Sequence, residues 1–216
     1  MWKCGESVKT RSKYHHGDLR EVLLELAVEH IAAVGVERLS IRELARRAGV
    51  SATAPFRHFP DKLTLLGALA IEGFTELANR MQIPAQRKQD REAQFVQLGI
   101  TYVEFAEDYP VHYQLMFGAV LGDFSKFPEL QQAASNAYSM LDKLLTAIKA
   151  EEKLHVDVNL LGGLVWSTVH GIASLKLNVF PAEQSLDAPP RQAVKALTQD
   201  LHGPLQMLYR GILAAK

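Results

Sequence analysis

The chain has 216 residues, of which 48% are hydrophobic and 22% charged, and its 24 basic and 24 acidic side chains leave no net charge. This balance excludes an intrinsically disordered chain and allows a sizeable core in one or two domains. The single cysteine, Cys4, excludes an intramolecular disulfide and fits a reducing compartment, so we expect a cytoplasmic protein. No apolar run approaches the ~18 residues that span a bilayer, so we expect no membrane association.

The N-terminal segment, residues 1–17, is predicted to form a basic arm, with Lys9, Arg11 and Lys13 among few apolar residues. Residues 1–62 hold 11 basic and 8 acidic side chains, whereas residues 63–216 hold 13 and 16. An asymmetry of this size arises by chance, so it does not identify a partner by itself.

Two short helices are predicted next, and a glycine ends each of them. Asp18-Leu19-Arg20-Glu21 fits a capping box, an apolar helical face follows it, and Gly35 is the expected stop. Ser40-Ile41-Arg42-Glu43 is a second capping box, and Gly49 ends this helix after about two to three turns.

The stretch SATAPFRHFPDK, from Ser51 to Lys62, is predicted to begin a third short helix. Pro55 fits its first turn, where a missing backbone N–H costs least. A short helix, a glycine turn and a second short helix form a helix-turn-helix pattern. In such units the second helix enters the major groove of DNA with its N-terminal end.

The side chains of this stretch fit that interpretation. Ala52 and Thr53 are small enough to approach base edges closely, and Arg57 and His58 can reach phosphates. Phe56 and Phe59 are expected to hold the helix against its neighbours. A plain helical hairpin with solvated charges is the alternative, because capping boxes and glycine stops occur in any helical protein.

The remaining two thirds also have helical periodicity, and no segment shows the alternation of a strand. The expected helices are 64–81, 88–108, 110–118, 128–150, 158–178 and 190–214, the last of them kinked or split at Gly203-Pro204. The sequence therefore predicts an all-α protein, with a basic arm (1–17), a three-helix DNA-binding domain (18–78) and a larger helical domain (79–216).

Aromatic residues gather in the middle of the chain. We expect a cavity for an apolar ligand lined by Tyr102, Phe105, Tyr113, Phe117, Trp166 and His170. The alternative is an ordinary core, in which His170 is a buried histidine with its hydrogen bonds satisfied. The proposed lining has no Lys or Arg, so a neutral or cationic effector is expected.

Three motifs closely resemble the N-terminal domain of TetR-type bacterial transcriptional regulators. They are YHHGDLR (14–20), LSIRELARRAGVS (39–51) and FRHFPDK (56–62), in the order and spacing of that family. The resemblance covers about residues 14–78 and implies phosphate contacts from Ser40, Phe56, His58 and Lys62. It also implies that Arg42, Ala52 and Thr53 face the bases or the groove floor. Phe56 stands where the family usually has tyrosine, so the hydroxyl donor is missing.

A further likeness concerns the C-terminal domain. YPVHYQLMFG (109–118) and WSTVHGIASL (166–175) look like a subgroup with a Trp…His-Gly signature. The family implies that the last two helices pair with those of a second copy, and the residues expected in that interface are Leu161, Val165, Val169, Leu201, Leu205 and Leu208. The alternative is that these helices belong to the core of their own chain. A palindromic operator on double-stranded DNA follows from such a homodimer.

The sequence thus predicts a ligand-responsive DNA-binding repressor, with a helical carrier or enzyme using the aromatic cavity as the alternative. We find no nucleophile elbow, P-loop or dinucleotide fingerprint, so we expect no catalytic residues and no cofactor. Glu151, Glu152 and His155 have helical metal spacing but no evident further ligand, so no metal site is expected either.

Overall fold

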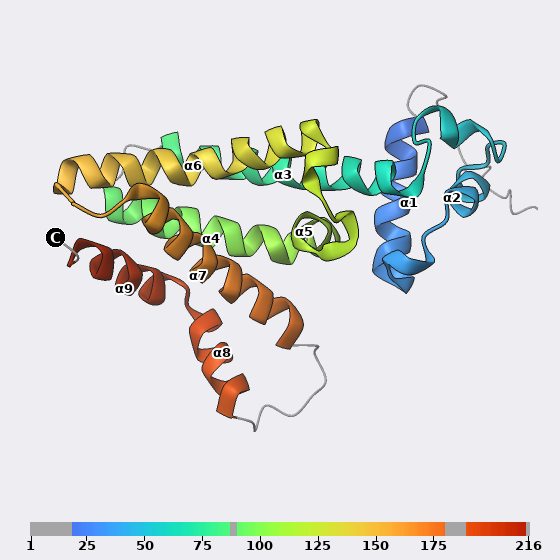
Figure 1. The fold of residues 1–216 in the computed structure, drawn as a ribbon. Helices are drawn as coiled ribbons and strands as arrows, with labels where there is room; N and C mark the ends of the chain where they lie inside the picture. Colours follow the sequence, from blue (N-terminus) through green and yellow to red (C-terminus); the bar gives the residue numbers. More distant parts are fainter. Residues whose placement is uncertain (1–18, 87–89, 180–188, 215–216) are drawn as a thin grey trace, which may run out of the picture. The chain divides into compact units, whose positions relative to one another are not determined.

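The structure is a computed structural model that describes residues 19–86, 90–179 and 189–214 (Figure 1). Within these ranges every regular element is a helix, which confirms the all-α prediction. The chain divides into unit 1, residues 1–62, and unit 2, residues 63–216. The predicted arm and the capping residue Asp18 lie outside the described residues, and the domain boundary expected at residue 78 stays a prediction.

Unit 1 is built from two α-helices and two short 3₁₀ turns. They are α1 (Leu19–Val34), η1 (Val36–Arg38), α2 (Ile41–Ala48) and η2 (Ala54–Arg57). α1 packs on α2 and η2. The core of the unit consists of Leu23, Leu24, Ala27, Ile31, Leu39, Ile41, Leu44, Ala45 and Phe59.

The predicted glycine stops are confirmed. Gly35 and Gly49 have φ angles of 89° and 70°, in the region that glycine adopts at least cost. The capping box expected before α2 is wrong, although Ser40 does occupy the position before the helix. Its side chain makes no capping hydrogen bond. Glu43 bonds Arg46 instead, at 2.6 and 2.9 Å.

The third helix of the unit is a single 3₁₀ turn, η2, rather than an α-helix. Pro55 lies in its first turn, as predicted, and its ring is buried. Because proline has no N–H and fixes its own φ, it suits a short turn of this kind. The residues that follow Gly49 are thus held in a compact exposed turn.

Unit 2 contains the remaining helices and turns of the described residues. They are α3 (Lys62–Gln86), α4 (Arg91–Asp108), α5 (Pro110–Phe117), η3 (Ala119–Leu121), η4 (Phe124–Lys126), α6 (Pro128–Glu152), α7 (Val158–Val179), α8 (Pro189–Gln199) and α9 (His202–Leu213). α3 begins at the last residue of unit 1. The split expected near Gly203-Pro204 is confirmed, because α8 and α9 are separate helices.

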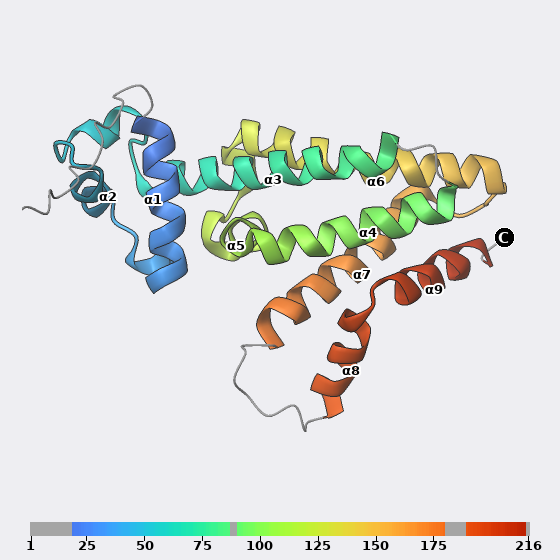
Figure 2. The same cartoon turned by 180° about the vertical axis from the view of Figure 1, so that it is seen from behind.

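α4 is the central helix of unit 2. It packs against α5, α6, α7 and α9, and α7 packs in turn against α6 and α8. Figure 2 shows α9 running along α4 and α8 beside the C-terminal half of α7. Helices that surround one central helix leave room for a cavity wherever their side chains do not fill the space between them.

Candidate functional site

The residues predicted to contact DNA lie on the surface of unit 1. Ser40, Arg42, Ala52, Thr53, Phe56, Arg57 and His58 are all exposed, and Lys62 is half-buried. They come from α2, from η2 and from the segments that flank them. The helix-turn-helix thus presents its small and basic side chains to solvent, although the individual DNA contacts stay predictions.

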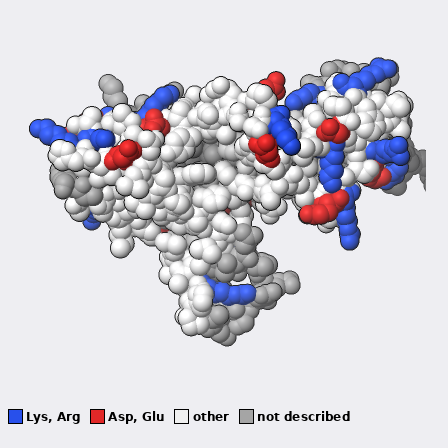
Figure 3. Space-filling model, viewed as in Figure 1, with Lys and Arg blue, Asp and Glu red and all other residues white. Residues whose placement is uncertain are grey.

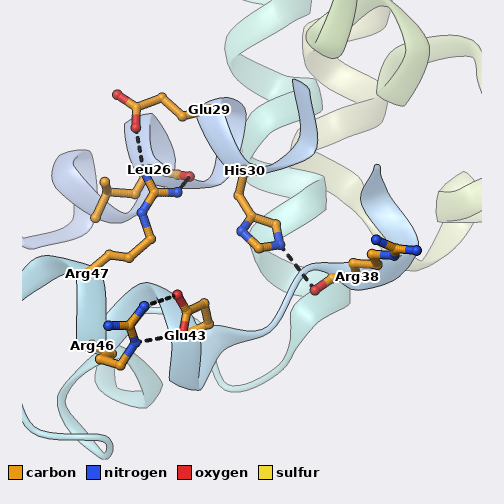
Figure 4. A network of polar contacts seen from close by, with 7 residues as sticks. All are labelled: Leu26, Glu29, His30, Arg38, Glu43, Arg46 and Arg47. Atoms are coloured by element: carbon orange, nitrogen blue, oxygen red, sulfur yellow. Dashed lines mark hydrogen bonds and ion pairs between the residues drawn. The ribbon is translucent and has the colours of Figure 1, made fainter. Parts of the chain in front are cut away.

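Two arginines of α2 are held in ion pairs, one of which joins α2 to α1 (Figure 4). The Arg47 side chain donates to the Glu29 carboxylate at 2.5 Å and to the main-chain oxygen of Leu26 at 3.3 Å. Arg46 donates to Glu43, and the pKa of that carboxyl is lowered mainly by this hydrogen bond. Among the described residues, Arg42 and Arg57 make no such pair.

Lys62 is already engaged within unit 1. Its Nζ donates to the main-chain oxygen of Glu37 at 3.0 Å. A phosphate contact would have to replace or share this bond.

Two phenylalanines of the turn have different roles. The expected packing role of Phe56 is wrong, since 41% of the residue is exposed. Phe59 is 2% exposed and fills the core, with the Arg20 guanidinium 5.6 Å from its ring centroid. Phe56 is therefore free to face a partner, whereas Phe59 fixes the turn to its unit.

A cavity of about 520 Å³ lies within unit 2. It is lined from α3 by Phe74, Leu77 and Met81; from α4 by Phe95, Leu98, Gly99 and Tyr102; from α5 and η4 by Met116, Phe117 and Phe124; from α6 by Ala134, Ser135, Ala137, Tyr138, Ser139, Leu141 and Asp142; and from α7 and α9 by Val165, Trp166, Val169 and Leu205. Its size and apolar walls suit a small-molecule ligand. In Figure 3 the middle of this face of unit 2 is hollowed and shows few charged side chains.

Half of the predicted lining residues reach the cavity. Tyr102, Phe117 and Trp166 line it. Phe105 is fully buried elsewhere in the core and stacks on Tyr109 at 5.3 Å between ring centroids. The sequence pattern did not separate the two faces of α4, because apolar residues occur on both.

Tyr113 and His170 lie outside the lining but are bonded to it. The Tyr113 and Tyr102 hydroxyls lie 2.8 and 3.1 Å from His170 Nδ1, and Trp166 Nε1 donates to the Tyr102 oxygen at 3.4 Å. Burial lowers the pKa of His170 and raises the pKa of Tyr102 to about 12. This part-buried network fixes the rings that form one wall of the cavity.

The Tyr102 shift predicts a pH dependence of stability. The pKa of Tyr102 is raised above the value near 10 of an unfolded tyrosine. The contribution of Tyr102 to the free energy of unfolding is therefore complete below about pH 10 and is lost as the pH rises through about 12. In urea denaturation, Tyr102→Phe should show a shallower loss of stability over this range than the wild type. Tyr138→Phe, which alters a phenol that is 37% exposed, is the control and should follow the wild type.

The α6 wall was missed by sequence reasoning. Tyr138 and Asp142 are one turn apart on a helix that reads as an ordinary amphipathic segment. Gly162 of α7 makes room for Tyr138, because a Cβ at Gly162 would overlap the Tyr138 hydroxyl. The sequence did offer one signal, because Gly162 lies within an apolar helix and such a glycine indicates that a neighbouring group packs closely against the backbone. The sequence does not identify that group as Tyr138.

The residues predicted for a dimer interface are mostly inside unit 2. Leu161, Val165, Val169 and Leu205 are at most 4% exposed, and Leu201 and Leu208 are half-buried. The exposed leucines of α7 are on the opposite face: Leu160 (67%), Leu164 (50%) and Leu175 (43%), with Gly163, Ser167 and Gly171 between them. We therefore move the proposed interface to this second face.

α7 is apolar enough to be compared with a membrane span. Its segment Val158–Leu177 has the length and composition of one, and a third of the most apolar window is buried within the chain. This differs from our expectation that no apolar run was long enough. A helix covered on one face by its own chain and on the other by a partner has the same composition.

Comparisons with known proteins identify a family for both the N-terminal and the C-terminal part of the chain. A family described as "Tetracyclin repressor-like, C-terminal domain" matches residues 95–207, more than half of the chain, and the tetR family of bacterial regulatory proteins matches residues 23–69. The nucleoid occlusion factor SlmA of Enterobacter sp. (strain 638) is 24% identical over 160 residues, which are 71% of this chain and 80% of that protein.

Solved structures share the fold. A protein of unknown function from Rhodococcus sp. RHA1 is 30% identical with a TM-score of 0.74, and the match covers 93% of this chain and 98% of that one. The transcriptional regulator FadR of Bacillus subtilis, solved with stearoyl-CoA, is 15% identical with a TM-score of 0.68, over 91% of this chain and 98% of that one. The chain therefore belongs to the TetR family of bacterial regulatory proteins and is a DNA-binding transcriptional regulator.

Proposed function

We propose that the protein is a cytoplasmic repressor that binds a palindromic operator as a homodimer and is released by a small-molecule effector. The observation that carries this proposal is the presence, in one chain, of an exposed helix-turn-helix and a ligand-sized apolar cavity. A helical carrier or enzyme would use the cavity but would have no use for the exposed basic side chains of unit 1.

We assign the base-reading role to Arg42. It is exposed on α2 and, within the described chain, has no side-chain partner to give up on binding. Ser40, Phe56, Arg57 and His58 are assigned to the phosphate backbone, together with Lys62. Phe56 has no hydroxyl, so its contact is limited to packing against the backbone or to its own main-chain N–H.

Arg42→Ala is expected to weaken operator binding by ~1–3 kcal/mol and to relax the preference at one base position per half-site. The operator is first selected from a random pool, and affinities for operator and random DNA are then measured at one salt concentration. Arg46→Ala is the matched control, because Arg46 is one turn further along α2 and is exposed but paired with Glu43. If Arg42→Ala lowers the affinity for operator and for random DNA equally, Arg42 does not read a base.

We propose that the homodimer forms through the exposed apolar face of α7. A Cβ at Gly163 or Gly171 would meet no atom within 4 Å, so a second helix can approach the backbone there. The leucines beside these small residues then bury apolar surface that the single chain leaves in water. A two-fold axis at this face makes the interface isologous and the operator palindromic.

Release follows if the effector binds the DNA-incompetent arrangement more tightly than the competent one. A 100-fold loss of operator affinity corresponds to a coupling free energy of ~2.7 kcal/mol. α3 is the element that we propose carries the change, because it begins at Lys62 in the DNA-binding unit and supplies Phe74, Leu77 and Met81 to the cavity wall.

We also propose that the protein belongs to the subgroup with the Trp…His-Gly signature. Trp166 lines the cavity and His170 bonds the two tyrosines behind it, so the signature residues have a shared place in unit 2. Gly171 follows on the exposed face of α7. The signature thus supports a link between the ligand wall and the proposed dimer face.

A further inference from the structure

The charge of the cavity wall is concentrated in one residue. Of the described residues that line it, Asp142 is the only one with an ionisable acidic or basic group of the Asp, Glu, Lys, Arg or His type. All others are apolar, aromatic or hydroxyl-bearing. A ligand bound there therefore meets a single carboxylate in surroundings that otherwise favour apolar groups.

Asp142 has no partner within the described part of the chain. Among the described residues no hydrogen bond or ion pair involves its carboxylate, and the residue is half-buried. Because no buried side-chain oxygen of the described residues lacks a partner, the Asp142 carboxylate is open to solvent. Some other acidic groups of unit 2 are paired: Glu107 with Lys176 at 2.7 Å and Glu151 with Arg91 at 2.6 Å. The Asp142 carboxylate is thus left to water, and a ligand cation can replace that water.

Aromatic rings line the same cavity as Asp142. Tyr138 is one turn before Asp142 on α6 and packs edge-to-face with Trp166 at 6.3 Å between ring centroids. Phe117, another residue of the lining, has its ring centroid 6.2 Å from that of Trp166. Ring faces attract cations as well as apolar groups.

We infer that the cavity binds an organic monocation, a protonated amine with an apolar body, whose charged end lies at Asp142 and whose body lies among the aromatic and aliphatic walls. This inference rests on the proposed function, in which the cavity holds the effector. An anionic ligand, such as a fatty acid or its thioester with a phosphate-bearing carrier, would bring a second negative charge to Asp142. Among the described lining residues no cation is present to compensate it.

The test uses three probes of equal chain length and the full-length protein without DNA. Decylammonium, 1-decanol and decanoate, each below its micelle concentration, are titrated at neutral pH by calorimetry. We expect decylammonium to bind most tightly and at least about tenfold more tightly than decanoate, because an ammonium gains a charge-assisted contact that the carboxylate lacks. Equal or tighter binding of decanoate to the wild type would overturn the inference.

Two variants separate the Asp142 carboxylate from the general charge of the unit. Asp142→Asn should weaken decylammonium about tenfold and leave 1-decanol unchanged. Unchanged 1-decanol binding also shows that the cavity is intact. Glu104→Gln removes an exposed carboxylate from α4 of the same unit and should bind all three probes as the wild type does. If Asp142→Asn binds decylammonium as tightly as the wild type, the carboxylate is not the anchor.

Failure of this inference and failure of the proposed function have different signatures. Operator affinity is measured separately, with and without saturating decylammonium. Binding through Asp142 without any change in operator affinity upholds the cation site and contradicts release by the effector. Absence of cation binding overturns the inference and leaves the regulator open to release by a different ligand.

Discussion

Leu161→Asp is expected to leave the purified chain largely unfolded. Leu161 is 3% exposed, on the face of α7 that packs into unit 2. The substitution removes a buried side chain, at a cost of about 2–5 kcal/mol, and places an unpaired charge in the core at a cost of several more. The sum approaches the whole stability of a typical domain, about 5–15 kcal/mol.

Circular dichroism and urea denaturation measure this effect. Leu160→Asp is the control, because Leu160 is the adjacent residue and is 67% exposed. It introduces the same side chain into the same helix and should leave the free energy of unfolding of the monomer close to that of the wild type. If Leu161→Asp is as stable as Leu160→Asp, then the burial of α7 has been assigned to the wrong face.

The double substitution Leu160→Asp/Leu164→Asp is expected to convert the dimer into a folded monomer. Both residues lie on the exposed face of α7 that we propose meets a second copy, one helical turn apart. Burying these unpaired carboxylates at each symmetric half should raise the dimer dissociation constant by at least about 100-fold. Sedimentation at micromolar concentration measures it.

The double variant should also have a lower affinity for the operator, because each monomer has one helix-turn-helix and contacts a single half-site. Val120→Asp is the matched control: Val120 is an apolar residue of unit 2, 39% exposed, that lies on η3 rather than on α7. It should stay dimeric and bind the operator normally. A wild-type chain that sediments as a stable monomer would falsify the dimer proposal itself.

The sequence predicted those features of the fold that depend on local backbone chemistry. Gly35 and Gly49 end their helices with positive φ angles, and Pro55 begins its turn, because these residue types restrict or release the backbone wherever they occur. The predicted Ser40 capping box does not form, and local side-chain chemistry explains this as well. Its partner Glu43 also has Arg46 one turn away, and an ion pair competes with the cap for the same carboxylate.

Features that depend on which face of a helix meets the core were harder to predict. Leu160 and Leu161 are equally apolar, and α7 has apolar residues around most of its circumference, so its sequence does not say which side its own chain covers. Phe105 and Phe117 are likewise both aromatic, yet one fills the core and the other lines the cavity.

Asp142 was missed for the opposite reason. A single carboxylate on an amphipathic helix is usually solvated, and its sequence neighbours do not show that the turn before it carries a cavity wall. Only the arrangement of α6 against α4 and α7 places it beside an apolar space. The site thus depends on tertiary packing that no local pattern encodes.

The contact between Gly162 and Tyr138 has a consequence for how such a sensor diversifies. Tyr138 keeps its place in the cavity wall only because residue 162 has no side chain. One added methyl at that position would displace the phenol and reshape the space beside Asp142, while the helix-turn-helix keeps every residue that reads DNA. Under the proposed function, chemical selectivity and genomic address are therefore encoded in separate parts of the chain, so that a lineage could exchange the compound it detects while it retains the genes it controls.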